Sequence, residues 1–216
     1  MLERQKHPLQ PYIPKNAVAL IIGTAPPWNF CVGNLDKLRE GEIAFFYGSI
    51  HNLFWYIMKA VFEPDNPRWP RTRLQCEDFL KRHQLAIGDI LQSFIRQDRK
   101  AADDHLSGFT FNRRLISLLH SSSHQIRYLY FSSQFAHELF LKALKKHKCV
   151  YHIQAENRSC KSYLITLQKK DKTFSYHCFI LNSPSPRINR SFDEMLRDYT
   201  VKFEVLKPNP IEDKEN

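Results

Sequence analysis

The stretch "NAVALIIGTAPP", residues 16–27, decides the fold class of this chain. Its apolar run is short and continuous, which is typical of a strand buried on both faces in a parallel sheet. The Gly-Thr pair and the two prolines then end the strand and begin a rigid loop. Because ligands bind beyond the carboxyl ends of strands in such sheets, this loop lies where a binding site is expected.

The rest of the chain alternates between helix-like and strand-like segments. Apolar spacing predicts helices over residues 52–62, 74–85, 111–121, 132–147 and 192–206. Extended segments are predicted over 42–48, 86–95 and 126–131, together with a hairpin whose arms are 162–168 and 174–181. This alternation predicts an α/β fold, a three-layer α/β/α sandwich with a central, mostly parallel sheet. We expect one domain over 17–206 and flexible tails at 1–16 and 207–216.

Composition narrows the class of partner. Hydrophobic residues make up 43% of the 216 residues, and the net charge is +10. A charge of this size favours nucleic acid first and an anionic membrane surface second, although a merely basic protein remains an alternative. No stretch approaches the roughly 18–20 apolar residues of a membrane span, and the polar start has no apolar signal core. We therefore expect a cytoplasmic protein in a bacterium or a nuclear one in a eukaryote.

The cysteines argue against two classes of site. They lack any C-x-x-C pair, so neither a disulfide framework nor a four-cysteine metal site is expected. They are the residues at positions 31, 76, 149, 160 and 178. We expect reduced thiols, and neither a metal nor a cofactor.

A second loop with binding chemistry follows the last predicted strand. In "NSPSPRINR", residues 182–190, prolines hold the backbone while Ser183 and Ser185 offer hydroxyl groups and Arg187 and Arg190 add charge. Such groups suit phosphate oxygens, although an ordinary proline-rich turn before a helix is the alternative. The first loop, "GTAPPW", matches neither a Walker loop nor a Rossmann fingerprint.

Several segments together resemble the uracil-DNA glycosylase superfamily, and most closely its hypoxanthine (deoxyinosine) and mismatch-specific branch. The first loop resembles the Gly-x-x-Pro motif, and "FFYGSIHNLFW" resembles the aromatic segment ending His-Pro-Arg-Asn-x-Phe-Trp. The remaining matches, in order, are "AIGDILQSFIRQDRKAADDHL" with Asp89, Ser93 and Arg96 in step, "YLYFSSQFAHELF", and "LNSPSPRIN" as the second motif. The resemblance covers roughly residues 17–192 and rests on the order and spacing of short motifs.

This resemblance implies a monofunctional DNA glycosylase of base excision repair, monomeric and free of cofactors. It would flip out hypoxanthine or uracil and hydrolyse the N-glycosidic bond. Asn52 would be catalytic, with its side-chain carbonyl free to orient a water, and His51 would stabilise charge on the base or the phosphates. The implied substrate-binding residues are Gly23, Thr24, Ala25, Pro26, Phe46 and Ser93. The implied DNA-binding residues are Ser183, Pro184, Ser185, Pro186, Arg187 and Ile188.

Two departures leave alternatives open. Ala25 stands where many members of the superfamily carry an Asp or Asn that activates water, and Ser49-Ile50-His51 replaces His-Pro-Arg. Asn52 is also an ordinary helix cap by position, and Phe46 an ordinary core residue. The alternative function is a non-catalytic nucleic-acid-binding module with the same fold. A phosphate-handling hydrolase has no supporting Ser/His/Asp order.

Overall fold

The computed structural model describes residues 2–33, 35–66, 68–97, 105–157, 161–185 and 189–207. Its main sheet runs in the order β3 (Leu85–Asp89), β2 (Ala19–Gly23), β6 (Tyr128–Phe131), β9 (Lys172–Ile180), β8 (Ser162–Lys169) and β7 (Val150–Asn157). The first four strands of this order are parallel, and β8 and β7 continue the sheet antiparallel. The predicted α/β class with a mostly parallel central sheet is confirmed.

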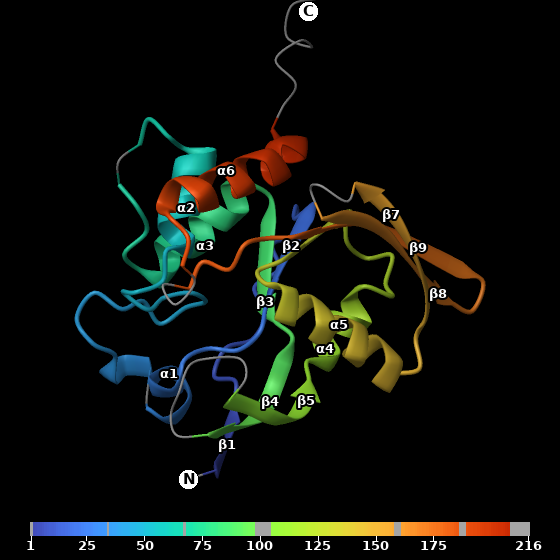
Figure 1. The fold of residues 1–216 in the computed structure, drawn as a ribbon, viewed down its shortest axis with the longest axis horizontal. Coiled ribbons are helices and arrows are strands. Elements are labelled where there is room, and N and C mark those ends of the chain that lie inside the picture. The colour runs from blue at the N-terminus through green and yellow to red at the C-terminus, as the bar shows by residue number, and fades with distance from the viewer. Residues whose placement is uncertain are drawn as a thin grey trace, which may run out of the picture.

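Helices cover both faces of this sheet (Figure 1). One face packs against α2 (Phe54–Phe62), α3 (Arg73–Arg82) and α6 (Phe192–Phe203), and the other against α4 (Arg113–Leu118) and α5 (Gln134–Lys146). The apolar run of strand β2 is continuous because both of its faces are buried. Ala19 and Ile21 enter one core, and Leu20 and Ile22 enter the other. Two-sided burial of this kind is what a central parallel strand requires.

A second, three-stranded antiparallel sheet lies beside the first and corrects two expectations. It contains β1 (Leu2–Lys6), β4 (Leu91–Gln97) and β5 (Leu106–Phe111), with β4 in the middle. The flexible tail predicted over 1–16 is therefore wrong for residues 2–6, which pair with β4, and for Tyr12, which bridges to Ile87. The single strand predicted over 86–95 is two strands in different sheets, because the chain turns at Ile90 between β3 and β4.

Two further elements differ from the prediction. Residues 42–48 form a turn and not a strand, since Ile43 N donates to Gly48 O and Tyr47 has a positive φ of 54°. Strand β7 was not predicted, because nearly all of its residues are exposed and show no apolar alternation. The predicted hairpin is confirmed as β8–β9. Ser133 caps α5, accepting a bond from Ala136 N at 3.0 Å.

Short helices complete the described chain. They are α1 (Trp28–Val32), η1 (Leu35–Lys37) and η3 (Glu204–Leu206). The four described cysteines are free thiols, and residues 208–216 of the expected C-terminal tail lie outside the described residues. Within the described ranges, none of the helices has the length and apolar character needed to cross a membrane.

Candidate functional site

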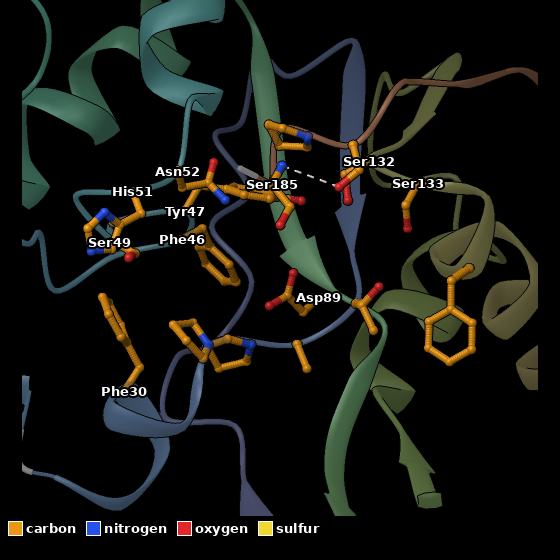
Figure 2. A pocket seen from close by; sticks show the side chains of 18 of the residues that line it. Phe30, Phe46, Tyr47, Ser49, His51, Asn52, Asp89, Ser132, Ser133 and Ser185 are labelled. Atoms are coloured by element: carbon orange, nitrogen blue, oxygen red, sulfur yellow. Dashed lines mark hydrogen bonds between the residues drawn. The ribbon is translucent and has the colours of Figure 1, made fainter. Parts of the chain in front are cut away.

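The carboxyl ends of β2, β6 and β9 open onto one cleft with a volume of about 850 Å³. Its lining includes the loops that follow these strands, at residues 24–28, 132–135 and 181–185. Residues 45–49 and 51–52, which precede α2, form another wall (Figure 2). The two loops singled out in the sequence, and the segment containing Asn52, therefore meet at one site, in the size range of small-molecule pockets.

The loop after β2 is held in place by a buried cation. Arg96, only 2% exposed, donates from Nη2 to the carbonyl oxygen of Pro26 at 2.7 Å and from Nε to Gln5 Oε1 at 2.9 Å. The backbone adds bonds from Ile90 N to Gly23 O at 2.8 Å and from Leu91 N to Thr24 O at 3.2 Å. Charge-assisted bonds in a buried setting are strong, so the second sheet fixes the position of this loop.

Gly23 allows two polar side chains to approach the end of β2. A Cβ atom at this position would lie 2.1 Å from Asp89 Oδ1 and 2.4 Å from Tyr47 Oη. Both distances are far inside van der Waals contact, so any side chain here would displace Asp89 or Tyr47. Gly23 does not line the cleft itself but underlies it, and its predicted role in binding substrate is corrected to one of spacing.

The segment before α2 is fixed by its aromatic residues. Tyr47 stacks on Phe54 with ring centroids 4.2 Å apart and 21° between planes. Trp55 Nε1 donates to the carbonyl oxygen of Phe46 at 2.9 Å, in a buried bond. Leu53 N donates to the carbonyl oxygen of Pro184 at 3.1 Å. This last bond joins the segment directly to the loop after β9.

Asn52 lines the cleft and also supports the start of α2. Its Oδ1 accepts a bond from Phe54 N at 2.9 Å, so the carbonyl is not free as the sequence predicted. A carbonyl oxygen has two acceptor sites, and one of them remains. Among the residues that the structure describes, none bonds to the amide nitrogen of Asn52. The capping alternative and the position at the cleft are therefore both realised in one residue.

A carboxylate and a histidine at the cleft were missed as site residues. Asp89, 6% exposed, ends β3, and its Oδ2 lies 2.7 Å from His7 Nε2. The Nδ1 atom of His7 accepts a bond from Leu9 N at 3.0 Å. His7 lies in the segment taken for a tail, so its position was not predictable. Asp89 was matched within the resemblance but given no role, although a lone acid that ends the apolar run "LAIGD" is a signal for a site.

The loop after β9 satisfies part of its prediction. Ser183, Pro184 and Ser185 line the cleft. The hydroxyl of Ser183 accepts a bond from Ser185 N at 3.4 Å, so it partly serves its own turn and does not simply face outward. Pro186, Arg187 and Ile188 lie outside the described residues. Arg190 is exposed at the cleft.

The other predicted residues divide into those at the cleft and one that is not. Thr24, Ala25, Pro26, Phe46 and His51 line it, although Figure 2 shows the ring of His51 directed away from Asp89 and Phe46. The prediction for Ser93 is wrong. After Ile90 the chain leaves the central sheet, so β4 carries Ser93 to the second sheet, where its Oγ accepts a bond from Arg4 Nη1 at 3.4 Å.

One thiol near the site is unsuited to nucleophilic chemistry. Burial raises the pKa of the Cys31 thiol to about 12, so at neutral pH it stays protonated. Further residues at the cleft were given no role in the sequence analysis. They include Phe30, Arg39, Glu42, Ser132, Phe135 and Lys161.

Comparison with known proteins does not assign the chain to a family. No protein-family model matches the chain, and no curated protein matches it. A resemblance to a family therefore rests on the quoted motifs and on the way their residues meet at the cleft.

Proposed function

We propose that this protein is a monofunctional DNA glycosylase that flips out a deaminated base, hypoxanthine or uracil, and hydrolyses its N-glycosidic bond in base excision repair. The observation that supports this most directly is the meeting of the two motif loops and the Asn52 segment at one cleft. The bond from Leu53 N to Pro184 O joins two of these segments, which are far apart in sequence.

The chemistry requires little beyond positioning. Loss of the base leaves a sugar with oxocarbenium character, which a water molecule then attacks, so orientation and electrostatics supply most of the rate. Asn52 offers an amide at the cleft beside the aromatic wall that contains Phe46 and Tyr47. Extruding the base from the duplex costs a few kcal/mol, and least at a mismatch. Stacking of the extruded base on this aromatic wall would offset part of that cost. Asn52 would direct the water to the anomeric carbon.

The charge distribution supports a polyanionic substrate. The chain carries a net charge of +10, and Arg39, Lys161 and Arg190 line the cleft. Contacts to phosphate release counterions, so affinity for DNA should fall steeply as salt rises. An affinity for a 20-mer duplex that stays flat between low and physiological salt would contradict DNA as the partner.

Two observations favour the alternative, a nucleic-acid-binding module without catalysis. Ala25 cannot activate a water, and the Oδ1 atom of Asn52 already accepts a bond from Phe54 N. If the module is correct, DNA binding persists while no base is released.

A direct assay separates these functions. Labelled oligonucleotides carrying hypoxanthine, uracil, xanthine or a G·T mismatch are incubated with excess protein, and abasic sites are revealed by alkali. We expect strand breaks at hypoxanthine or uracil. Asn52→Ala should abolish the product if this cleft makes it, whereas a contaminating enzyme would be unaffected. Ser93→Ala, which lies outside the cleft, is the matched control and should keep the activity of the wild type. Retained DNA binding with no abasic product from any substrate would reject the glycosylase and leave the binding module.

A further inference from the structure

The cleft holds a carboxylate whose negative charge the fold does not neutralise. Asp89 projects into the cavity near Phe46 (Figure 2). Because Leu9 N–H donates to His7 Nδ1, that nitrogen carries no proton, and the proton of this imidazole is on Nε2, which donates to Asp89. His7 is thus neutral and supplies a hydrogen bond without a compensating charge. Within the described ranges, this bond is the one that the Asp89 carboxylate makes.

The buried cation of this region is directed elsewhere. Arg96 donates to Pro26 O and Gln5 Oε1, and no ion pair joins it to Asp89 among the described residues. The other positive groups of the cleft, Arg39, Lys161 and Arg190, are exposed. The cleft therefore combines exposed positive charge, which suits phosphates, with a buried negative charge.

The walls around Asp89 are aromatic. The ring of Phe46 lies 5.6 Å from that of His7, and Trp28, Phe30 and Tyr47 also line the cleft. Aromatic faces carry partial negative charge and attract cations, more strongly when water is excluded. Aromatic faces beside a buried carboxylate form a suitable site for a flat, positively charged ligand.

The way in which a cationic base departs points to the same class of ligand. A purine alkylated at N3 or N7 is a cation while attached to the sugar. When the bond from C1′ to nitrogen breaks, its electron pair moves to the base and neutralises that charge, so the base departs without being protonated. Water then adds to the sugar cation at C1′ and releases one proton to solvent. Ala25 stands where many members of the superfamily carry a water-activating Asp or Asn, and a base that departs this readily leaves a sugar cation that water attacks with little activation.

We infer that the cleft accepts cationic, ring-alkylated purines, with Asp89 contacting the positive base, in addition to deaminated bases. This inference rests on the proposed glycosylase function and extends its range of substrates. The contact acts mainly in selecting the base, because the positive charge moves from the base to the sugar as the bond breaks.

The test compares two substrates and matched charge changes. Duplexes carrying a single 7-methylguanine or a single hypoxanthine are assayed under single-turnover conditions. Asp89→Asn keeps an acceptor for His7 Nε2–H but removes the charge. Glu42→Gln removes the same charge at the same cleft, from a carboxylate that already accepts bonds from Asn29 Nδ2 and Arg39 N. Asp89→Glu keeps the charge, and thermal melts report the folding of each variant.

We expect the wild type to release 7-methylguanine, and Asp89→Asn to slow that release at least tenfold more than it slows release of hypoxanthine. Glu42→Gln should affect the two substrates equally, and Asp89→Glu should keep the preference for the cation. If hypoxanthine or uracil is released but 7-methylguanine is not, the inference is wrong and the glycosylase function stands. If Asp89→Asn and Glu42→Gln shift selectivity equally, Asp89 is not the contact. Release of no base at all rejects both proposals together.

Discussion

The loop after β2 and the segment before α2 form two walls of one cleft, yet they are built in opposite ways. Residues 23–27 are held by the buried guanidinium of Arg96 and by backbone bonds from Ile90 and Leu91, but Ala25 and the prolines offer no reactive group. Residues 45–53 turn on themselves, include Tyr47 at a positive φ, and carry Asn52. One wall is thus fixed by a buried charge, whereas the wall with the proposed catalytic residue is held by aromatic packing and by one bond to a neighbouring loop.

The largest expected effect tests the wall fixed by the buried charge. Arg96→Met removes a charged donor from Pro26 O and from Gln5 Oε1. Each bond from a charged group contributes about 1.5–3 kcal/mol, so loss of the two bonds should lower the free energy of unfolding by about 3–6 kcal/mol. Urea denaturation measures this loss of stability, provided that the variant and the wild type have the same m-value. Arg197→Met, an exposed arginine bonded to Asp193 O, is the control. A loss below ~1 kcal/mol would show that the loop does not depend on Arg96.

The second prediction tests the wall that carries Asn52. Asn52→Ala should slow the single-turnover rate by roughly 100-fold or more, the scale seen when a key electrostatic group is removed. It should also cost about 1 kcal/mol of stability, because the bond to Phe54 N is lost. Asn52→Asp keeps that acceptor and serves as the control for stability. If the single-turnover rate of Asn52→Ala per folded molecule equals that of the wild type, Asn52 only supports the start of α2.

The third prediction acts where the two walls meet. Gly23→Ala would place a Cβ atom against Asp89 Oδ1 and Tyr47 Oη. Overpacking of this kind typically costs about 1–3 kcal/mol, and both displaced side chains belong to the cleft. A thermal melt together with substrate selectivity measures both consequences. Gly33→Ala is the matched control, because its new Cβ atom would meet a single atom, Asn29 O, at 3.2 Å. Equal effects at the two glycines would contradict a special role for Gly23.

The smallest expected effect separates the contribution of a helix cap to stability from a contribution to the reaction. Like Asn52, Ser133 lines the cleft and accepts a bond from a helical amide, that of Ala136. Ser133→Ala should cost about 1 kcal/mol of stability and leave the rate per folded molecule nearly unchanged. Single-turnover kinetics and a melt of the same sample measure both. A drop in rate as large as that of Asn52→Ala would mean that both sides of the cleft contribute to the chemistry.

The sequence predicted those parts that local pattern controls. The apolar run before Gly23 and the prolines of both loops placed the strands and the cleft, because burial and backbone restriction act over a few residues. The apolar spacing over residues 132–147 predicted helix α5 for the same reason.

The remainder depends on contacts that sequence patterns do not contain. The polar segment that becomes β1 is extended only because β4 offers it an edge. His7 and the anchoring role of Arg96 follow from that pairing. Ser93 was misplaced because nothing in "GDILQS" shows that the chain changes sheets at Ile90.

Strand β1 pairs with β4, a strand that leaves the ribosome much later, with Leu2 opposite Gln97. Each residue of β1 must therefore wait during synthesis until β4 has emerged, and closing so long a loop is slow compared with forming a helix. His7, next to β1, reaches Asp89 only after this event. Because β3 ends at Asp89 and β4 begins at Leu91, the first parallel pair, β2 with β3, and the pairing of β1 with β4 become possible at almost the same stage of synthesis. The floor of the cleft can thus form before β6 and β9 supply the other loops that line it.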